Sequence, residues 1–284
     1  MELMDQAHTS FRDRGKDIVV FYNKNELPHI SIPHLHSGYE VYYNISGAKG
    51  FMVNGEFLKC GSHDLIVIPK VQAHKVLVKK NVPYERCIIN VSDGALEMIQ
   101  KLSPCPIDLS WLTGHHDGAP LTGNLNQTQH EAYLQMIHSY NAYEQVDGMK
   151  ALAVFAQLLA FLRERFEQPE RTEYLDSSEI TYSDLVLQQI EFSFKTASVS
   201  EITDKVFVCE DYANRLFRKE TGMTIKQYLT IRKIAEAKKF LFLGKSVKEA
   251  CLLSGFGNYA NFIRTFKKYE GFSPGELEEL TQPL

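Results

Sequence analysis

The chain of 284 residues contains no CxxC pair, a single tryptophan, and no apolar run near the about 20 residues needed to cross a bilayer. Its five cysteines are scattered and odd in number, which fits neither a disulfide framework nor a zinc ribbon and favours reduced thiols. The polar, mixed-charge start MELMDQAHTSFRDRGKD does not predict a signal peptide. We therefore expect a cytoplasmic protein without membrane contact.

Net charge is only −4, but it is unevenly distributed. Residues 205–268 contain 14 Lys and Arg against 5 acidic residues, which gives this segment +9 and leaves −13 on the rest of the chain. A basic block joined to an acidic body indicates a two-part protein whose C-terminal part binds a polyanion. A helical domain that merely solvates its surface with charge would look the same, so charge alone leaves both interpretations open.

The first third of the chain has the pattern of a β domain. Short stretches rich in β-branched and aromatic residues alternate with Gly, Asn and Pro, and VNGE at 53–56 is typical of a hairpin turn. Many short strands at this spacing favour a barrel or sandwich. After a loop-like stretch at 103–124, apolar periodicity predicts helices at 127–145 and from Leu152 to Phe166. These two helices either pack on the barrel or form a subunit interface.

The C-terminal part contains one pattern twice. Segments 198–222 and 246–271 each begin with Ser-Val-x-Glu, at the spacing of a capping box, and each ends with Gly after basic residues. A short helix, a turn and a second helix lie in between, which is the pattern of helix-turn-helix units. The stretch 224–244 predicts one connecting helix of roughly 30 Å. Successive major-groove faces of B-DNA are roughly 34 Å apart.

We therefore predict that the second helix of each unit enters a major groove. Arg can recognise guanine and Asn adenine, whereas Lys suits phosphate contacts. The competing interpretation is a helical bundle with charged outer faces, which the repeated units and the basic block disfavour. The predicted DNA-binding residues are Asp211, Asn214, Arg215, Arg218 and Lys219 in the first unit, and Asn258, Tyr259, Asn261, Arg264, Lys267 and Lys268 in the second.

Residues 183–275 resemble the DNA-binding domain of AraC-type (AraC/XylS) transcriptional regulators. The most specific stretch is SVKEACLLSGFGNYANFIRTFKKYEGFSP, which is similar to the second helix-turn-helix signature of that family. The resemblance implies base recognition by residues around 211–218 and 258–265. The first unit departs from the family pattern, with Phe207 where Gly is usual and Cys209 where a Ser-like cap is usual. Since positive φ is unfavourable for Phe, we expect a reshaped turn or weaker docking there.

The N-terminal part carries residues that suit a metal. In PHLHSGYE (33–40), His34, His36 and Glu40 share parity and would face one side of a regular strand, and His74 follows later. Three imidazoles and a carboxylate suit a borderline divalent metal. The spacing, with Gly47 following, resembles the cupin motifs, and AraC-type regulators often carry a cupin-like sensing domain followed by two helices that can pair subunits.

Three interpretations compete for this cluster: the metal centre of an enzyme, a metal-free pocket for a small organic effector, or plain structural residues. We favour the effector pocket, because a polar cluster in an apolar barrel gives a small-molecule site its specificity. This interpretation involves no catalytic residue, no metal and no cofactor. The predicted effector-binding residues are His34, His36, Glu40, Tyr42 and His74, and all of these except Tyr42 are the candidates should a metal bind.

The predicted fold is α+β, with a cupin-like β-barrel and two helices at 1–166, a linker at 167–182 and an all-α double helix-turn-helix domain at 183–284. We expect a non-enzymatic, ligand-responsive regulator of a carbohydrate or related metabolite operon. Its expected partners are double-stranded DNA, a small-molecule effector such as a sugar, and a second copy of the chain, with RNA polymerase as a further candidate. Two rivals stay open: a cupin metalloenzyme (isomerase or dioxygenase) with a helical appendage, and a DNA-binding regulator whose N-terminal domain only dimerises.

Overall fold

The computed structural model describes residues 17–25, 33–53, 55–79, 81–113, 120–167, 173–176 and 178–281. The strands are β1 (Ile18–Asn25), β2 (Tyr39–Ser46), β3 (Ala48–Val53), β4 (Glu56–Lys59), β5 (Asp64–Ile68), β6 (His74–Val78), β7 (Tyr84–Val91) and β8 (Leu121–Asn124). The helices are α2 (Asp93–Leu102), α3 (Ser110–Thr113), α4 (Gln127–Tyr143), α5 (Gly148–Phe166), α6 (Tyr182–Ser193), α7 (Val199–Lys205), α8 (Glu210–Thr221), α9 (Ile225–Phe242), α10 (Val247–Leu253), α11 (Tyr259–Glu270) and α12 (Pro274–Thr281). None of these helices combines the length and the apolar character that a membrane span requires.

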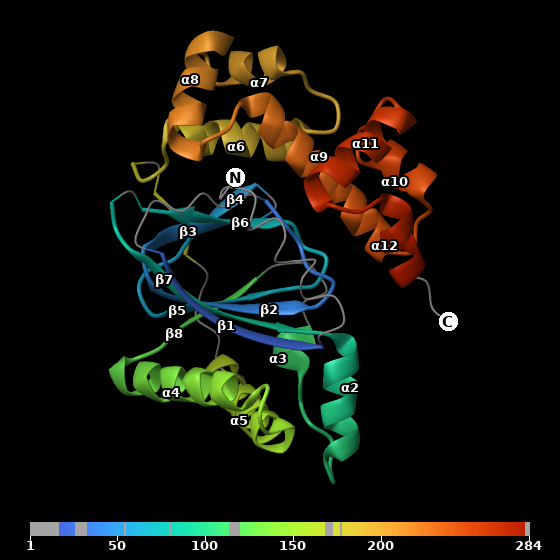
Figure 1. Ribbon diagram of the computed structural model, residues 1–284. Helices are drawn as coiled ribbons and strands as arrows, with labels where there is room; N and C mark the ends of the chain where they lie inside the picture. The colour runs from blue at the N-terminus through green and yellow to red at the C-terminus, as the bar shows by residue number, and fades with distance from the viewer. Residues whose placement is uncertain are drawn as a thin grey trace.

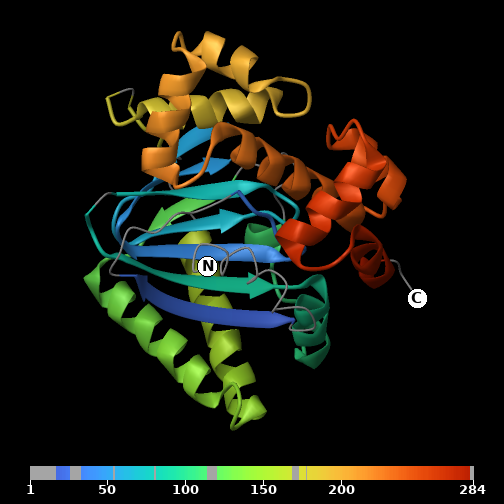
Figure 2. The same ribbon diagram turned by 45° about the horizontal axis from the view of Figure 1, so that its top comes forward.

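The strands form two antiparallel sheets, ordered β1-β7-β2-β5-β8 and β4-β3-β6 (Figures 1 and 2). Side chains alternate along the central strand β2. Val41 and Tyr43 belong to the core shared with α4 and α5, whereas Tyr42 lies between the sheets with Phe51 of β3. Both faces of β2 are therefore covered, which explains why its sequence has no solvated side.

Helices α4 and α5 cover the outer face of the five-stranded sheet (Figure 1). Tyr133 of α4 and Phe155 of α5 are fully buried in one core with Val41 and Leu65 of the sheet. The two helices predicted behind the barrel are thus present and pack on it. The stretch 103–124, which the sequence suggested was loop, contains α3 and β8, because β8 adds an edge strand to β5.

The C-terminal domain consists of two helical groups joined by α9, which runs from α6–α8 to α10–α12 (Figures 1 and 2). The second group has its own apolar core, whereas the core of the first group also includes Met52, Phe57 and Leu77 of the barrel. Ser198 and Ser246 form the two predicted capping boxes at the starts of α7 and α10. The 18 residues of α9 span about 27 Å.

Buried charges fasten the two groups to each other through α9. The guanidinium of Arg232 lies 2.7 Å from Glu191 of α6 and 3.2 Å from Glu236, and all three side chains are buried. Lys233 donates a hydrogen bond to the carbonyl oxygen of Gly255, in the turn between α10 and α11, at 2.9 Å. The connector is therefore tied to both units, so that their relative orientation is held by specific contacts.

Part of the predicted linker 167–182 is held on the barrel. Tyr174 pairs with Leu58 of β4, and the backbone N–H of Lys59 donates to the carbonyl oxygen of Glu173 at 2.8 Å. Leu175 is 7% exposed and joins the core formed with α6. The prediction of an α+β chain, a β-rich domain followed by an all-α domain, is confirmed.

Candidate functional sites

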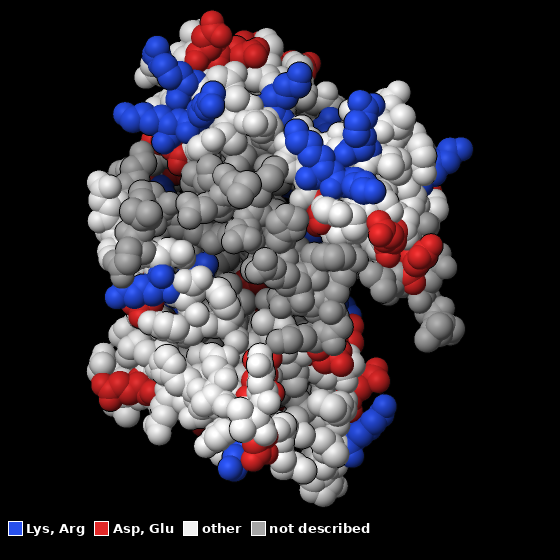
Figure 3. All heavy atoms as spheres, in the orientation of Figure 1, with Lys and Arg blue, Asp and Glu red and all other residues white. Residues whose placement is uncertain are grey.

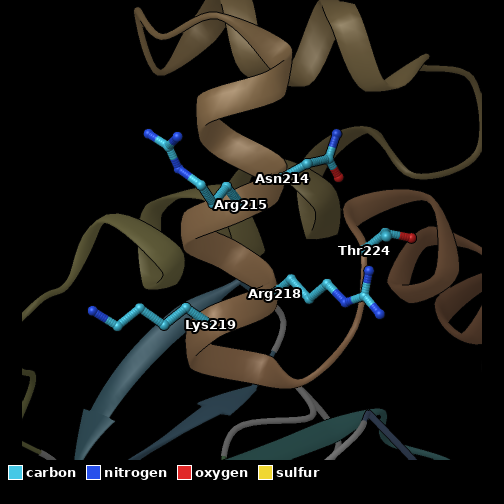
Figure 4. A pocket seen from close by; sticks show the side chains of 5 residues that line it. All are labelled: Asn214, Arg215, Arg218, Lys219 and Thr224. Carbon is cyan, nitrogen blue, oxygen red and sulfur yellow. The ribbon is translucent and has the colours of Figure 1, made fainter.

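Helix α8 presents a basic face in the first unit. Figure 4 shows Arg215 and Lys219 projecting from one side of the helix, while Arg218 reaches toward Thr224 at the start of α9. With Asn214, these residues line a pocket of about 460 Å³. Four of the five residues predicted to bind DNA in this unit are exposed: Asp211, Arg215, Arg218 and Lys219.

Asn214 is half-buried and already engaged. Its Oδ1 accepts a hydrogen bond from the backbone N–H of Ile225, at 3.1 Å, and so caps the start of α9. Bidentate recognition of adenine uses both the oxygen and the nitrogen of the amide. Asn214 could recognise adenine in this way only by giving up this bond, and its contact with a base stays a prediction.

Helix α11 presents the corresponding face of the second unit. Phe262 and Phe266 are completely buried and hold one side of the helix on its core, so the polar side points outward. Asn258 has a second task as the N-cap, because its Oδ1 accepts from the backbone N–H of Asn261 at 2.8 Å. All six residues predicted here are exposed: Asn258, Tyr259, Asn261, Arg264, Lys267 and Lys268.

The positive charge gathers on one face of the molecule. In Figure 3, Lys and Arg form two groups, one over α8 and one over α11. The basic block found in the sequence is thus concentrated where the two candidate recognition helices are exposed. Such a distribution attracts a polyanion that contacts both units at once.

Of the two expectations for Phe207, a reshaped turn is wrong, whereas weaker docking stays a prediction. Phe207 adopts a φ of 59° and is 94% exposed, while Gly255 occupies the corresponding turn of the second unit with a φ of 83°. The aromatic residue therefore accepts a left-handed conformation that favours glycine. The missing cap is as expected, since Cys209 begins α8 without a side-chain hydrogen bond.

Four of the five predicted effector residues come together at the end of the barrel. His34, His36, Glu40 and His74 each offer one ligand atom, and these atoms lie within 4.8 Å of one another. His36 Nε2 is 2.8 Å from one oxygen of Glu40, and His74 Nε2 is 3.6 Å from the other. Glu40 and His74 are each 3% exposed, so the cluster is largely shielded from water.

The convergence does not come from a regular strand. Residues 37 and 38 form a bend, and β2 begins only at Tyr39. At Gly38 an added Cβ would lie 2.4 Å from the carbonyl oxygen of Val91, so only glycine fits this close approach to β7. His34 exchanges two backbone hydrogen bonds with His74. The bend and this bridge bring the histidines over Glu40, where parity alone would not have placed them.

Electrostatics favour the ionised form of Glu40. Burial by itself raises the pKa of this carboxyl, but His74 and His36 outweigh burial and hold the pKa well below its ordinary value. Tyr42 lies deeper and is 1% exposed, with its hydroxyl donating to that of Tyr84 at 3.1 Å. Burial, followed by the neighbouring Tyr84, raises the pKa of Tyr42 well above its usual value. Tyr42 is therefore paired inside the barrel and does not join the four ligand groups.

Sequence reasoning missed the contact between the barrel and the first helix-turn-helix unit. Leu77 of β6 shares a core with helices of the C-terminal domain, and Lys49 pairs with Asp184 of α6 at 2.7 Å. Lys75, only 6% exposed, lies over the ring of Tyr228 of α9 at 4.9 Å. Burial lowers the pKa of Lys75 to about 8. The strand HKVLV (74–78) could have indicated this contact. Side chains of a strand alternate between its two faces, and apolar or long side chains on both faces suggest that both are covered.

Family models match most of the chain. A model described as "AraC-like ligand binding domain" matches residues 17–182, more than half of the sequence, and one described as "Helix-turn-helix domain" matches residues 202–279. The chain belongs to the AraC family. The family prediction made from the sequence is thereby confirmed, and a ligand-binding domain precedes a helix-turn-helix domain in the chain.

The curated relatives of this AraC-type chain match only part of its length and only part of their own. The "Melibiose operon regulatory protein" of Escherichia coli (strain K12) is 30% identical over 86 residues, which cover 30% of this chain and 28% of that protein. The "Transcriptional regulatory protein HptR" of Staphylococcus aureus (strain NCTC 8325) is 31% identical over 119 residues, covering 42% and 46%. The match thus spans less than half the length of either relative. The crystal structure of ToxT from Vibrio cholerae O395 covers 95% of this chain and 100% of its own at 10% identity, with a TM-score of 0.38.

Proposed function

We propose that this AraC-type protein is a sequence-specific DNA-binding regulator of transcription that responds to a ligand in its N-terminal domain. The observation that carries the proposal is the pair of exposed basic helices, α8 and α11, held by one rigid connector. The proposed contacts to bases come from Arg215 and Arg218 in α8 and from Arg264 in α11. Lys219, Lys267 and Lys268 are proposed to contact phosphates, which position the protein without specifying sequence.

DNA binding is tested by selecting genomic fragments with the tag-free protein and measuring their affinity by fluorescence anisotropy. Affinity should fall steeply as salt rises, because phosphate contacts release counterions. Arg264→Ala should weaken binding by on the order of 1–3 kcal/mol and relax the preference at one base pair. Arg163→Ala, an exposed arginine of α5, is the matched control and should leave both unchanged. If Arg264→Ala also changed neither quantity, the proposed orientation of α11 would be wrong.

The effector is proposed to act at the cluster of His34, His36, Glu40 and His74. A sugar or related metabolite is the candidate class, since one relative is named for a melibiose operon. We propose no catalytic role for the chain, because its relatives are named as regulators. The rival metalloenzyme would predict turnover of a substrate, whereas the regulator predicts altered DNA affinity. A metabolite that is converted by the purified protein would therefore contradict the proposal.

The signal is proposed to pass through the three-stranded sheet. Strand β6 carries His74 at the cluster and, on its opposite face, Lys75 and Leu77 at the contact with α6 and α9. A ligand that favours one position of β6 would bias how the first unit sits on the barrel. Hydrogen exchange of α6 and α9 should change when the effector binds. A ligand that altered DNA affinity while leaving this exchange unchanged would rule out the route.

Two copies of the chain are proposed to bind paired half-sites, with α4 and α5 forming the dimer contact. The two helices bury one side on the barrel, and Val146 in the turn between them and Met149 in the first turn of α5 are exposed, at 85% and 77%. A chain that sediments as a monomer while it occupies paired half-sites would refute this contact.

RNA polymerase is a further proposed partner for activation, and a DNA target implies a cytoplasmic location. The five cysteines are free, as a reducing compartment requires.

A further inference from the structure

The cluster at the end of the barrel contains buried polar atoms that no hydrogen bond satisfies. His36 Nε2, Glu40 Oε2 and His74 Nε2 are all buried without a hydrogen-bond partner among the described residues. His36 Nε2 and Glu40 Oε2 contact each other at 2.8 Å, and neither atom has a further hydrogen-bond partner among the described residues. Buried polar atoms are almost always satisfied in native proteins, so three such atoms facing one point require an explanation.

The hydrogen bond made by the other ring nitrogen of His74 determines what its Nε2 presents to Glu40. Its Nδ1 is 2.9 Å from the carbonyl oxygen of Gln72, and because a carbonyl can only accept, Nδ1 carries the hydrogen. In the neutral imidazole, Nε2 therefore presents a lone pair toward Glu40, whose nearest oxygen is 3.6 Å away. A lone pair that faces a carboxylate is unfavourable, and either a proton on Nε2 or a cation between the two groups would relieve it. A backbone carbonyl that holds the far ring nitrogen is also the usual support of a metal-binding histidine.

We propose that the side chains of His34, His36, Glu40 and His74 directly coordinate one divalent transition-metal ion. The inference rests on the proposed function in taking this cluster as the effector site. Imidazole and carboxylate together suit ions such as Zn²⁺, Mn²⁺, Fe²⁺ or Co²⁺. Opposite ligand atoms around such an ion are about 4.2 Å apart at metal–nitrogen distances of about 2.1 Å. The observed spread of up to 4.8 Å therefore needs a contraction of about 0.6 Å around a six-coordinate ion, and a larger one around a tetrahedral ion.

The space directly between the four ligand atoms suits an ion, so an organic effector that acts at this cluster would bind beside the ion and not between the ligand atoms. Pockets for small organic ligands usually enclose roughly 300 Å³ or more. Here the ligand atoms face one another across less than 5 Å, and the barrel behind them is filled by Tyr42 and Phe51, each 1% exposed. One ion satisfies the orphaned atoms of His36, Glu40 and His74 together, which no single hydrogen bond could do.

The test is a metal titration of the full-length, tag-free protein after dialysis against a chelator. Co²⁺ and Zn²⁺ are the probes, followed by calorimetry, by the visible d–d absorption of bound Co²⁺, and by the melting temperature. We expect one ion per chain, a raised melting temperature and Co²⁺ bands that show nitrogen and oxygen ligands. His36→Ala and Glu40→Gln should each weaken binding by at least about 10-fold, because loss of a direct ligand costs no less than loss of its supporting partner.

His138→Ala is the matched control, because His138 is an exposed histidine of α4 whose ring packs on Tyr22, away from the cluster. It should bind the metal as the unchanged chain does. Melting of every variant without metal checks that it folds, and Glu40→Gln retains the shape of the side chain should His36→Ala fold poorly. The proposal is overturned by substoichiometric binding, or by binding that persists in both site variants, which would indicate an adventitious ion.

The outcome separates this inference from the proposed function. A protein that takes up no metal but binds DNA and responds to a metabolite would overturn the metal site alone. A protein that binds one ion at the cluster but has no affinity for selected DNA would overturn the regulatory function alone. Metal titration and DNA anisotropy measured on the same preparation therefore test the two proposals independently.

Discussion

Replacing Phe207 by glycine should stabilise the protein, although it removes a large aromatic side chain. Phe207 follows α7 in the turn of the first helix-turn-helix unit with a φ of 59°, and its ring is 94% exposed. The equivalent turn of the second unit contains Gly255, with a φ of 83°. The variant Phe207→Gly therefore gives the first turn the residue type that its backbone conformation favours.

The expected magnitude follows from three contributions at Phe207. A left-handed conformation costs an L-residue about 1–2 kcal/mol, and glycine avoids this. Glycine gives up about 0.5–1 kcal/mol through its greater freedom in the unfolded chain. The small buried part of the ring, from a side chain that offers roughly 200 Å², is worth about 0.3 kcal/mol at 25 cal/mol per Å². The net expectation is a gain of about 0.5 kcal/mol over the unchanged chain.

Urea denaturation of the full-length chain measures this gain, provided that all variants share the same m-value. Phe207→Ala is the matched control, because it removes the ring but keeps the strained backbone. We expect Phe207→Gly to exceed Phe207→Ala by about 0.5–1 kcal/mol in the free energy of unfolding. If the alanine variant proved as stable as the glycine variant, positive φ at this turn would not be a source of strain.

Two further predictions concern buried charges. Arg232→Ala should lower the free energy of unfolding by about 3–5 kcal/mol in urea denaturation, because it leaves Glu191 and Glu236 buried without their common partner. Lys75→Met should raise it by about 1–3 kcal/mol at neutral pH, since burial disfavours the ammonium and lowers the pKa of Lys75 to about 8. A destabilised Lys75→Met variant would instead show that the contact with the ring of Tyr228 outweighs the burial of the charge.

The helical half of the chain was predictable because its signals are local. Capping boxes at Ser198 and Ser246, glycines at the ends of α8 and α11 and a connector without internal Gly or Pro specify the helices from neighbouring residues alone. Solvent-facing arginines and lysines then follow from the apolar periodicity of each helix. The role of Asn214 was not predictable, because its partner, the backbone N–H of Ile225, is provided by the next helix.

The sequence predicted which residues form the barrel cluster, but not the backbone contacts that bring them together. Parity on a regular strand predicted that His34, His36 and Glu40 lie together, but the bend at residues 37–38 and the bridge between His34 and His74 are what bring them together. These contacts join residues that are far apart in sequence, and a single sequence does not specify them. Tyr42 illustrates the same limit, because its hydroxyl is paired to Tyr84, which lies 42 residues further along the chain.

A strand with one face at the proposed ligand cluster and the other at the first helix-turn-helix unit would be a short path between ligand binding and DNA binding. In β6, His74 and Lys75 are adjacent, so their Cα atoms are about 3.8 Å apart. The side chain of His74 belongs to the cluster, whereas that of Lys75 lies over the ring of Tyr228 in α9. A displacement of the strand at His74 therefore moves Lys75 as well. Coupling between binding sites is typically about 1–3 kcal/mol, a change of about 5–150-fold in affinity. A sub-ångström contraction around a bound ion could supply such a bias, because the helices on the other face pack directly against the same sheet.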